Sequence, residues 1–159
     1  MKFVSLQDTG WQAVDAAETA PAAAPQRLLT LAQWQAVRAS WPAELPVAVT
    51  LPNTFDVEEL AADLPRIALL ALQFPKWTDG RAYSQARTLR VRLGYQGEVR
   101  ATGEVLVDML PLLQRTGVDA VQLRADQREE SARRALTLVT ENYQGDVSQT
   151  RPLFARLAA

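Results

Sequence analysis

The chain has 159 residues, 48% of them hydrophobic and 22% charged, which fits a single globular domain with its own core. Its formal net charge of −1 gives no general attraction to nucleic acid or to membranes, and we expect neither as a partner. The absence of cysteine and histidine excludes disulfides, thiolate nucleophiles, Ser-His-Asp triads and self-ligated iron–sulfur clusters, so we expect no intrinsic cofactor and no metal site.

Residues 1–29 are predicted to form an N-terminal arm. Its start, "MKFVSLQDTGW", lacks the long apolar core of a signal peptide, and no apolar run approaches the ~20 residues of a membrane span, so we expect a cytoplasmic protein. "KFVSL" has the pattern of a short strand, and residues 13–25 are rich in Ala and Pro, which is typical of a mobile linker.

Residues 30–159 are predicted to form a single α/β domain. Thr30 is expected to cap a helix in which Leu31 and Trp34 share a face and which ends before Trp41. Further along the chain, strands are predicted at 46–51, 66–74, 98–102 and 119–124, and helical segments at 56–64, 81–93, 103–117 and 127–144.

The helical segments carry their own start and stop signals. In 81–93 an apolar stripe with spacings of four, three and four ends before Gly94, a plausible C-terminal stop. Gly117 is expected to close the segment 103–117, and Pro111 to bend it by removing one hydrogen bond. The residues of the stripe are Ala82, Ala86, Leu89 and Leu93.

The order of these elements predicts the architecture. The run at 66–74 is apolar throughout, as in strands that are buried on both faces. Strand–helix units with short connections predict a mostly parallel sheet with right-handed crossovers. About four strands cannot close an eight-stranded barrel, which leaves two alternatives, an open sheet or a partial barrel-like arc.

Charge is unevenly distributed along the chain. Residues 1–80 carry 5 basic and 9 acidic side chains, whereas residues 81–159 carry 12 and 9. Of the 17 basic residues, 15 are arginine. This bias has two interpretations, genomic base composition or a preference for forked donors that grip carboxylates and oxyanions.

A ligand site of a parallel α/β fold lies beyond the carboxyl ends of the strands. Asn53 and Asp56 follow the first predicted strand, and the turn that contains Trp77 follows the second, so these residues lie where a ligand site is expected. Arg100, within the third strand, points to the same side as Thr102 because alternate residues share a face. The candidate anion-binding residues are Arg81, Arg100, Thr102, Gly103 and Arg124.

Asp79 is the candidate catalytic residue, as the acid or base of a small α/β enzyme in which the arginines hold an anion. Two other roles are open to it. It can cap the helix that begins near Gly80, or it can orient Arg81 or Arg100 toward an anion.

Arg100 would be costly to bury without a partner. We therefore expect it to pair with Asp79 or Asp108, or to face a solvated ligand cavity.

Trp77, Arg87 and Arg90 are the candidate docking residues. Trp77 is the aromatic residue expected to line a pocket or an interface, since it lies in a loop between Lys76 and Asp79. Arg87 and Arg90 are expected on the outer face of their helix, either simply solvated or as a docking surface for an acidic partner.

The stretch "FPKWTDGRAYSQARTLRVRLGYQGEVRATGEVLVDMLPLLQRTGVDAVQL" resembles a bacterial family called domain of unknown function 934. Its pattern includes FP-x-[FW]-x-DGR-x-[FY]-S-x-A-R-x-LR and G-E-[LV]-RA-x-G, which occur here from Phe74 to Arg90 and from Gly97 to Gly103. Relatives often carry Cys and Phe where this chain has Thr116 and Val118. If a cysteine were essential to a shared reaction, this chain could not perform it.

The resemblance implies a role in sulfur metabolism, since members of the family are commonly described as oxidoreductases probably involved in sulfite reduction. It suggests an accessory or partner protein of assimilatory sulfite reduction, whose partner is sulfite reductase or a related enzyme. An alternative is a small enzyme acting on a phosphorylated or sulfur-containing metabolite, with Asp79 as acid or base and an arginine clamp. A third hypothesis is a half-barrel whose open edges pair in a homodimer.

Overall fold

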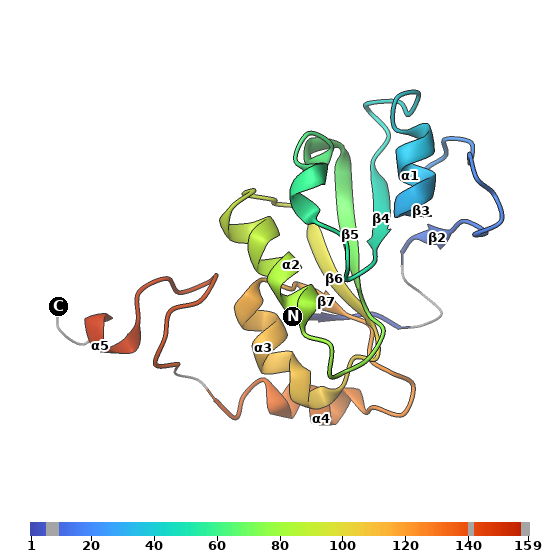
Figure 1. Ribbon diagram of the computed structural model, residues 1–159. Helices are drawn as coiled ribbons and strands as arrows, with labels where there is room; N and C mark the ends of the chain where they lie inside the picture. Colours follow the sequence, from blue (N-terminus) through green and yellow to red (C-terminus); the bar gives the residue numbers. More distant parts are fainter. Residues whose placement is uncertain (6–9, 140–141, 157–159) are drawn as a thin grey trace.

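The computed structural model describes residues 1–5, 10–139 and 142–156. Within these residues seven strands form one sheet, in the order β1-β7-β6-β5-β4-β3-β2, and all neighbouring strands are parallel (Figure 1). The sheet is open and curled into a half-barrel, which confirms the predicted α/β class and parallel arc. The strands are β1 (Lys2–Phe3), β2 (Gln12–Ala13), β3 (Arg27–Thr30), β4 (Val47–Leu51), β5 (Ile67–Phe74), β6 (Glu98–Gly103) and β7 (Ala120–Val121).

The described strands outnumber the four predicted ones because the N-terminal segment contributes three more. β1 pairs with β7 at one edge of the sheet, while β3 pairs with β4 and β2 with β3 at the other. β1 lies within "KFVSL", where the sequence predicts a short strand, whereas β2 has only two residues and no detectable period, so only its pairing with β3 reveals it. The segment predicted as an arm thus supplies strands at both edges of the sheet.

Helices and 3₁₀ turns follow most of the strands. The helices are α1 (Leu31–Val37), α2 (Arg81–Val91), α3 (Leu110–Thr116), α4 (Glu129–Ala135) and α5 (Leu153–Arg156), and the 3₁₀ turns are η1 (Val57–Leu60), η2 (Leu64–Arg66) and η3 (Val107–Met109). Residues of α1 to α4 share one apolar core with the sheet, whereas α5 lies at the end of a projecting segment (Figure 1). No helix of the described ranges is long and apolar enough to cross a membrane.

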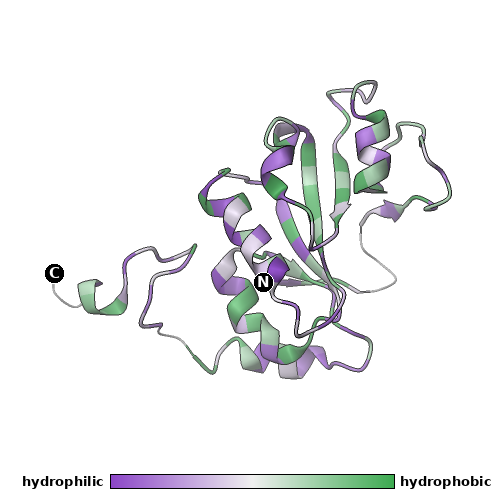
Figure 2. Cartoon of the chain, viewed as in Figure 1, coloured by the Kyte–Doolittle hydropathy of each residue, from purple (hydrophilic) through white to green (hydrophobic). Residues whose placement is uncertain are grey.

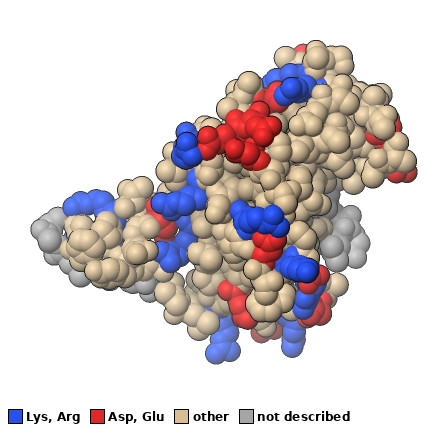
Figure 3. All heavy atoms as spheres, viewed as in Figure 1, with Lys and Arg blue, Asp and Glu red and all other residues tan. Residues whose placement is uncertain are grey.

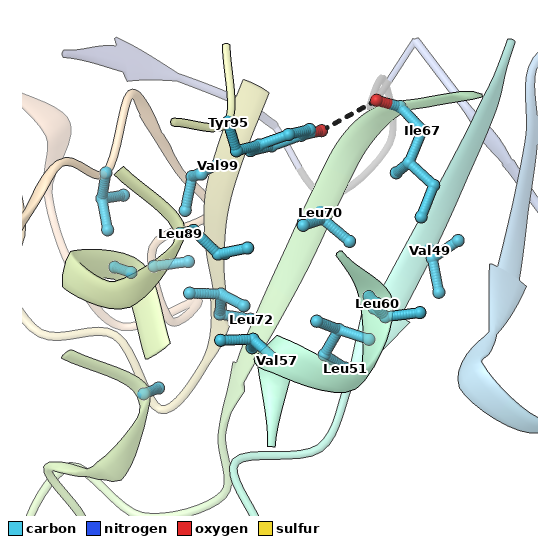
Figure 4. Close-up of a cluster of buried hydrophobic side chains, with 14 of the residues drawn as sticks. Val49, Leu51, Val57, Leu60, Ile67, Leu70, Leu72, Leu89, Tyr95 and Val99 are labelled. Carbon is cyan, nitrogen blue, oxygen red and sulfur yellow. Dashed lines mark hydrogen bonds between the residues drawn. The ribbon is translucent and has the colours of Figure 1, made fainter. Parts of the chain in front are cut away.

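The main core lies between the helices and one face of the sheet. Alternate residues of β4 and β5, among them Leu51 and Leu72, are fully buried there together with Leu60 and Leu89 (Figure 4). Apolar residues are concentrated along these central strands (Figure 2). Burying each such leucine contributes roughly 1.5–3 kcal/mol, which fixes the register of the strands because a one-residue slip would expose the whole set.

The other face of the sheet carries a smaller apolar cluster. Ala48, Leu69 and Ala71 are buried there, and Trp11 and Leu28 pack against them. The N-terminal segment therefore contributes side chains to this face as well as strands to the edges.

Several local signals have the predicted effect. Thr30 accepts a hydrogen bond from the backbone of Gln33 at 3.2 Å, and the Gln33 side chain accepts one from the backbone of Thr30 at 2.8 Å, which forms a capping box at the start of α1. Gly117 ends α3 with a left-handed φ of +97°.

Other local predictions are wrong. Pro111 lies in the first turn of α3, where its missing N–H costs no hydrogen bond, so it starts the helix instead of bending it. Among the described residues of 127–144, the α-helix covers only Glu129–Ala135, and 56–64 forms 3₁₀ turns. The strand predicted at 119–124 is reduced to Ala120–Val121.

Candidate functional site

The carboxyl ends of the central strands lie along one edge of the sheet, as parallel pairing requires. Leu51 is in register with Leu72, and Phe74 with Gly103. The turns that follow β4, β5, β6 and β7 therefore form a continuous rim, which holds most of the predicted site residues.

The turn after β5 is organised by an ion pair between Asp79 and Arg81. The Arg81 guanidinium donates from Nε to Oδ1 at 2.9 Å and from Nη2 to Oδ2 at 2.6 Å, and its backbone N–H donates to Oδ1 at 3.3 Å. The Asp79 carboxylate thus accepts a backbone N–H at the start of α2 and pairs with the arginine, whereas orienting this arginine toward an anion stays a prediction.

The pKa of Asp79 is held well below its usual range, chiefly by the hydrogen bond from the Arg81 side chain and in part by Asn53. Asn53 is buried, and its Nδ2 makes no hydrogen bond of regular geometry although it lies near this carboxylate. A low pKa makes a carboxylate a weak base at neutral pH. The catalytic role of Asp79 stays a prediction, and this environment does not favour it.

Arg100 is buried, with 3% of its surface exposed, and it pairs with Glu98. Its Nε and Nη2 lie 2.7 and 2.6 Å from Oε1 of Glu98, the residue two positions earlier on the same face of β6. The expectation that Asp79 or Asp108 would be this partner is wrong. Small neighbours in register, Ala71 and Ala120, flank Arg100 on both sides.

This pairing places the Arg100 charge away from the rim. Glu98 is the first residue of β6, whereas the turn that contains Asp79 follows the carboxyl end of the neighbouring strand. Lys2 of β1 also approaches Glu98, at 3.8 Å. The structure therefore joins Arg100 to an ion cluster on the sheet face, not to Arg81.

Arg124, after β7, lies between two carboxylates. Its Nη1 donates to Glu104 at 2.6 Å, and its Nε and Nη2 donate to Asp126 at 2.7 and 2.8 Å. These bonds raise the pKa of Arg124 and lower the pKa of Asp126 to about 2. One guanidinium between two carboxylates leaves this trio with a formal charge of −1, which disfavours a second anion.

A groove of about 270 Å³ lies beside this trio. Phe3 and Ser5 of the N-terminal segment line one part of it, and Leu123, Arg124 and Gln127 line another. Sequence reasoning did not find this groove because it depends on β1 lying next to β7.

Thr102 and Gly103, at the end of β6, lie in close contact with β5. The Thr102 hydroxyl donates to the Leu72 carbonyl at 3.3 Å, and the Glu104 N–H donates to the Phe74 carbonyl at 2.8 Å. Gly103 has a φ of +94°, and a Cβ at this position would lie 2.5 Å from the Phe74 oxygen. The close approach of two strands thus explains this glycine, and its anion-binding role stays a prediction.

Arg90 is not on a solvated face, so that expectation is wrong. Its side chain is 13% exposed, and it donates to the carbonyls of Gly117 at 3.0 Å and Gly97 at 2.9 Å, to that of Tyr95, and to the carboxylate of Asp119. Arg90 therefore ties α2 to two loops and is not exposed for docking.

Trp77 and Arg87 are exposed, as a docking role requires. Trp77 has 56% of its surface exposed, which is unusual for so large an apolar side chain. Acidic and basic side chains lie next to one another on the face shown in Figure 3. The docking role of these two residues stays a prediction.

Three ion pairs of the site share one spacing that could have been recognised from the sequence. Asp79 with Arg81, Glu98 with Arg100, and Arg124 with Asp126 are each two residues apart. The missed partners are Glu98, Glu104 and Asp126. Within the described residues, no group of three or more carboxylates could hold a metal ion.

The fold and the site define an open parallel α/β half-barrel whose rim arginines are paired with carboxylates. Residues 48–154 match the model of a family described as "Bacterial protein of unknown function (DUF934)", and the chain belongs to this family. No curated protein matches the chain. The match begins in β4 and extends into α5, so the strands β1, β2 and β3 precede it.

Proposed function

We propose that this chain is an accessory protein of assimilatory sulfite reduction that acts by binding another protein, sulfite reductase or a related cytoplasmic enzyme of sulfur assimilation. The pathway comes from the family resemblance. The binding role is supported by one observation above all, that Arg81, Arg100 and Arg124 each have a carboxylate partner already. An oxyanion would have to compete with these partners.

Trp77 is the proposed anchor of the interface. Interface energy is concentrated in a few residues, and tryptophan and arginine are the most frequent among them. Trp77 lies three residues after Phe74, whose ring packs edge-to-face on Tyr83 with centroids 5.2 Å apart. The exposed indole therefore extends from a well-packed support, which reduces the entropy lost on binding.

Arg87 is proposed to contribute charge to the same interaction. It lies on the exposed side of α2, while Ala82, Ala86 and Leu89 face the core. An acidic patch on the partner would match it, and such pairs at the rim of an interface act mainly on the association rate.

The test is binding of the purified chain to sulfite reductase by surface plasmon resonance, together with reductase activity in a deletion strain. We expect Trp77→Ala to weaken binding at least about tenfold, and Arg87→Glu to slow association. Arg128→Glu, a reversal at the exposed N-cap of α4, is the matched charge control. No association with the reductase, and unchanged reductase activity on deletion, would rule the docking role out.

Oxyanion binding at the turns around Arg81 and Gly103 remains part of the proposal, but we expect it to be weak. An anion there would have to share Arg81 with Asp79. The enzyme alternative needs Asp79 to exchange a proton, and its low pKa weakens that role.

A further inference from the structure

The C-terminal arm, residues 142–156, projects beside α3 with α5 at its end (Figure 1). It is folded upon itself. The Leu153 N–H donates to the Tyr143 carbonyl at 3.1 Å, and the Asp146 N–H donates to the Gln149 carbonyl at 2.7 Å. The backbone near Gly145 comes so close to Thr150 that a Cβ would overlap the Thr150 oxygen. The arm thus has a defined, hook-like conformation. It lies almost wholly within the region that matches the family model.

Asp146 and Val147 of the arm are fastened to the end of α3. The Val147 N–H donates to the Arg115 carbonyl at 3.2 Å, and the Arg115 guanidinium lies 3.6 Å from the Asp146 carboxylate. This anchor fixes where the arm leaves α3, and Arg156 of α5 lines a pocket of about 300 Å³ together with Gln114 and Leu136.

The arm and the segment before it expose large apolar side chains. Tyr143 and Phe154 are 70% and 59% exposed although their rings pack together, with centroids 5.6 Å apart. Leu138 and Val139 are exposed as well. An aromatic pair displayed in this way marks an interaction surface, because a monomer gains nothing by leaving such area in water.

A groove of about 240 Å³ lies between α3 and the residues that follow α4. Pro111, Leu112, Leu136 and Val139 supply its apolar lining, and Asp108 lies at its side. Asp108 is exposed and has no ion pair among the described residues, and the same holds for Arg151 on the arm. The arm thus carries an aromatic pair and a positive charge, and the groove carries apolar walls and a negative charge.

We propose that the arm is exchanged between two copies of this chain, with the Tyr143–Phe154 pair of each copy in the α3–α4 groove of the other and Arg151 against Asp108. Because the arm and the groove are on the same chain, a two-fold axis places each arm in the groove of the other copy. The assembly is then closed as a dimer. Four half-exposed rings and the surfaces they cover would bury roughly 1,000 Å², near the lower limit for a specific interface. This dimer differs from one made by sheet edges, which β1 and β2 occupy.

The test is sedimentation equilibrium of the full chain without any partner, so its outcome is independent of reductase binding. We expect a dimer with a dissociation constant below about 100 µM, weakened more than about tenfold by Tyr143→Ser with Phe154→Ser and also by Leu112→Asp. Val91→Ser, at an exposed apolar position of α2 outside the arm and the groove, is the control and should leave the dimer unchanged.

Charge reversal gives a second, independent readout. Arg151→Glu and Asp108→Arg should each weaken the dimer, and the two together should restore part of the affinity. Circular dichroism of each variant is the check that it is folded. A wild-type monomer up to about 100 µM, or arm variants that dimerise as well as the wild type, would overturn the proposal. If the wild type is a monomer and the arm variants lose reductase binding, the arm serves a different protein.

Discussion

Gly117 lies directly against the aliphatic stem of Arg90, so closely that a Cβ at position 117 would overlap Cγ of the arginine. The same arginine donates from Nε to the Gly117 carbonyl at 3.0 Å. This contact joins α2 to the turn between α3 and β7, and it explains both the arginine and the glycine by packing. Arg90 also stacks over the ring of Tyr95, whose hydroxyl donates to the Ile67 carbonyl at 3.1 Å (Figure 4).

Gly117→Ala should destabilise the fold more than Gly94→Ala. Both glycines have positive φ, +97° and +63°, which costs an alanine roughly 1 kcal/mol. Only position 117 adds a steric overlap, since nothing lies within 4 Å of a Cβ at position 94. We expect the difference in unfolding free energy between the two variants to be about 1–3 kcal/mol by urea denaturation. Equal losses would show that the Arg90 stem moves aside freely.

Arg90→Ala should lower the free energy of unfolding by about 2–4 kcal/mol, because it leaves several loop carbonyls without their donor. Arg90→Lys should recover little of this, since an ammonium cannot reproduce the forked geometry. Arg87→Ala, on the exposed side of the same helix, is the control and should change stability by less than about 0.5 kcal/mol. Similar losses at the two positions would contradict the structural role of Arg90.

Acidification should weaken the fold in part through Asp126. Arg124 lowers the pKa of this carboxyl from 3.8 to about 2, because the ion pair favours the charged form. A carboxyl with a lowered folded-state pKa stabilises the fold above its unfolded pKa, and this contribution is lost as the pH falls through the folded value. The contribution of Asp126 should therefore be complete above about pH 4 and mostly lost near pH 2.

The measurement is urea unfolding of the wild type and of Asp126→Asn at about pH 5 and at about pH 2. The variant should lose less stability on acidification than the wild type. Asp56→Asn, which removes a carboxylate that caps η1 but has no arginine partner among the described residues, should behave like the wild type. An identical acid response of all three proteins would refute a role for the Arg124 pair.

Asp79→Asn should strengthen oxyanion binding, because it removes the charge that now occupies Arg81. Isothermal titration with sulfite or sulfate should show binding no tighter than about millimolar for the wild type and tighter binding for the variant. Arg81→Ala combined with Asp79→Asn should abolish the gain. Tight binding by the wild type that Asp79→Asn weakens would instead favour a real anion site that uses this carboxylate.

The rim of the sheet could be located from the sequence, and so could those partners of its charged residues that are neighbours along the chain. Asp79 and Arg81 are neighbours in one turn, so their pairing is a local property and was among the alternatives considered. Arg100 was expected either to pair with a carboxylate or to face a solvated cavity, since a buried guanidinium needs a counter-charge or water, and the structure shows it buried and paired. Glu98 has the same two-residue spacing as the other close pairs, but its choice over Asp79 or Asp108 depends on how the Arg100 side chain bends across the sheet face, which the tertiary structure decides.

The sequence by itself determined the parallel α/β class, the capping of α1 by Thr30 and the stop at Gly117, because each depends on residues a few positions apart along the chain. Only the tertiary structure decided that the N-terminal strands β1 and β2 lie at opposite edges of the sheet and that Arg90 is an internal tie. These features rest on contacts between distant segments. The local sequence around a very short strand or a single arginine is the same whether or not a distant segment of the chain contacts it.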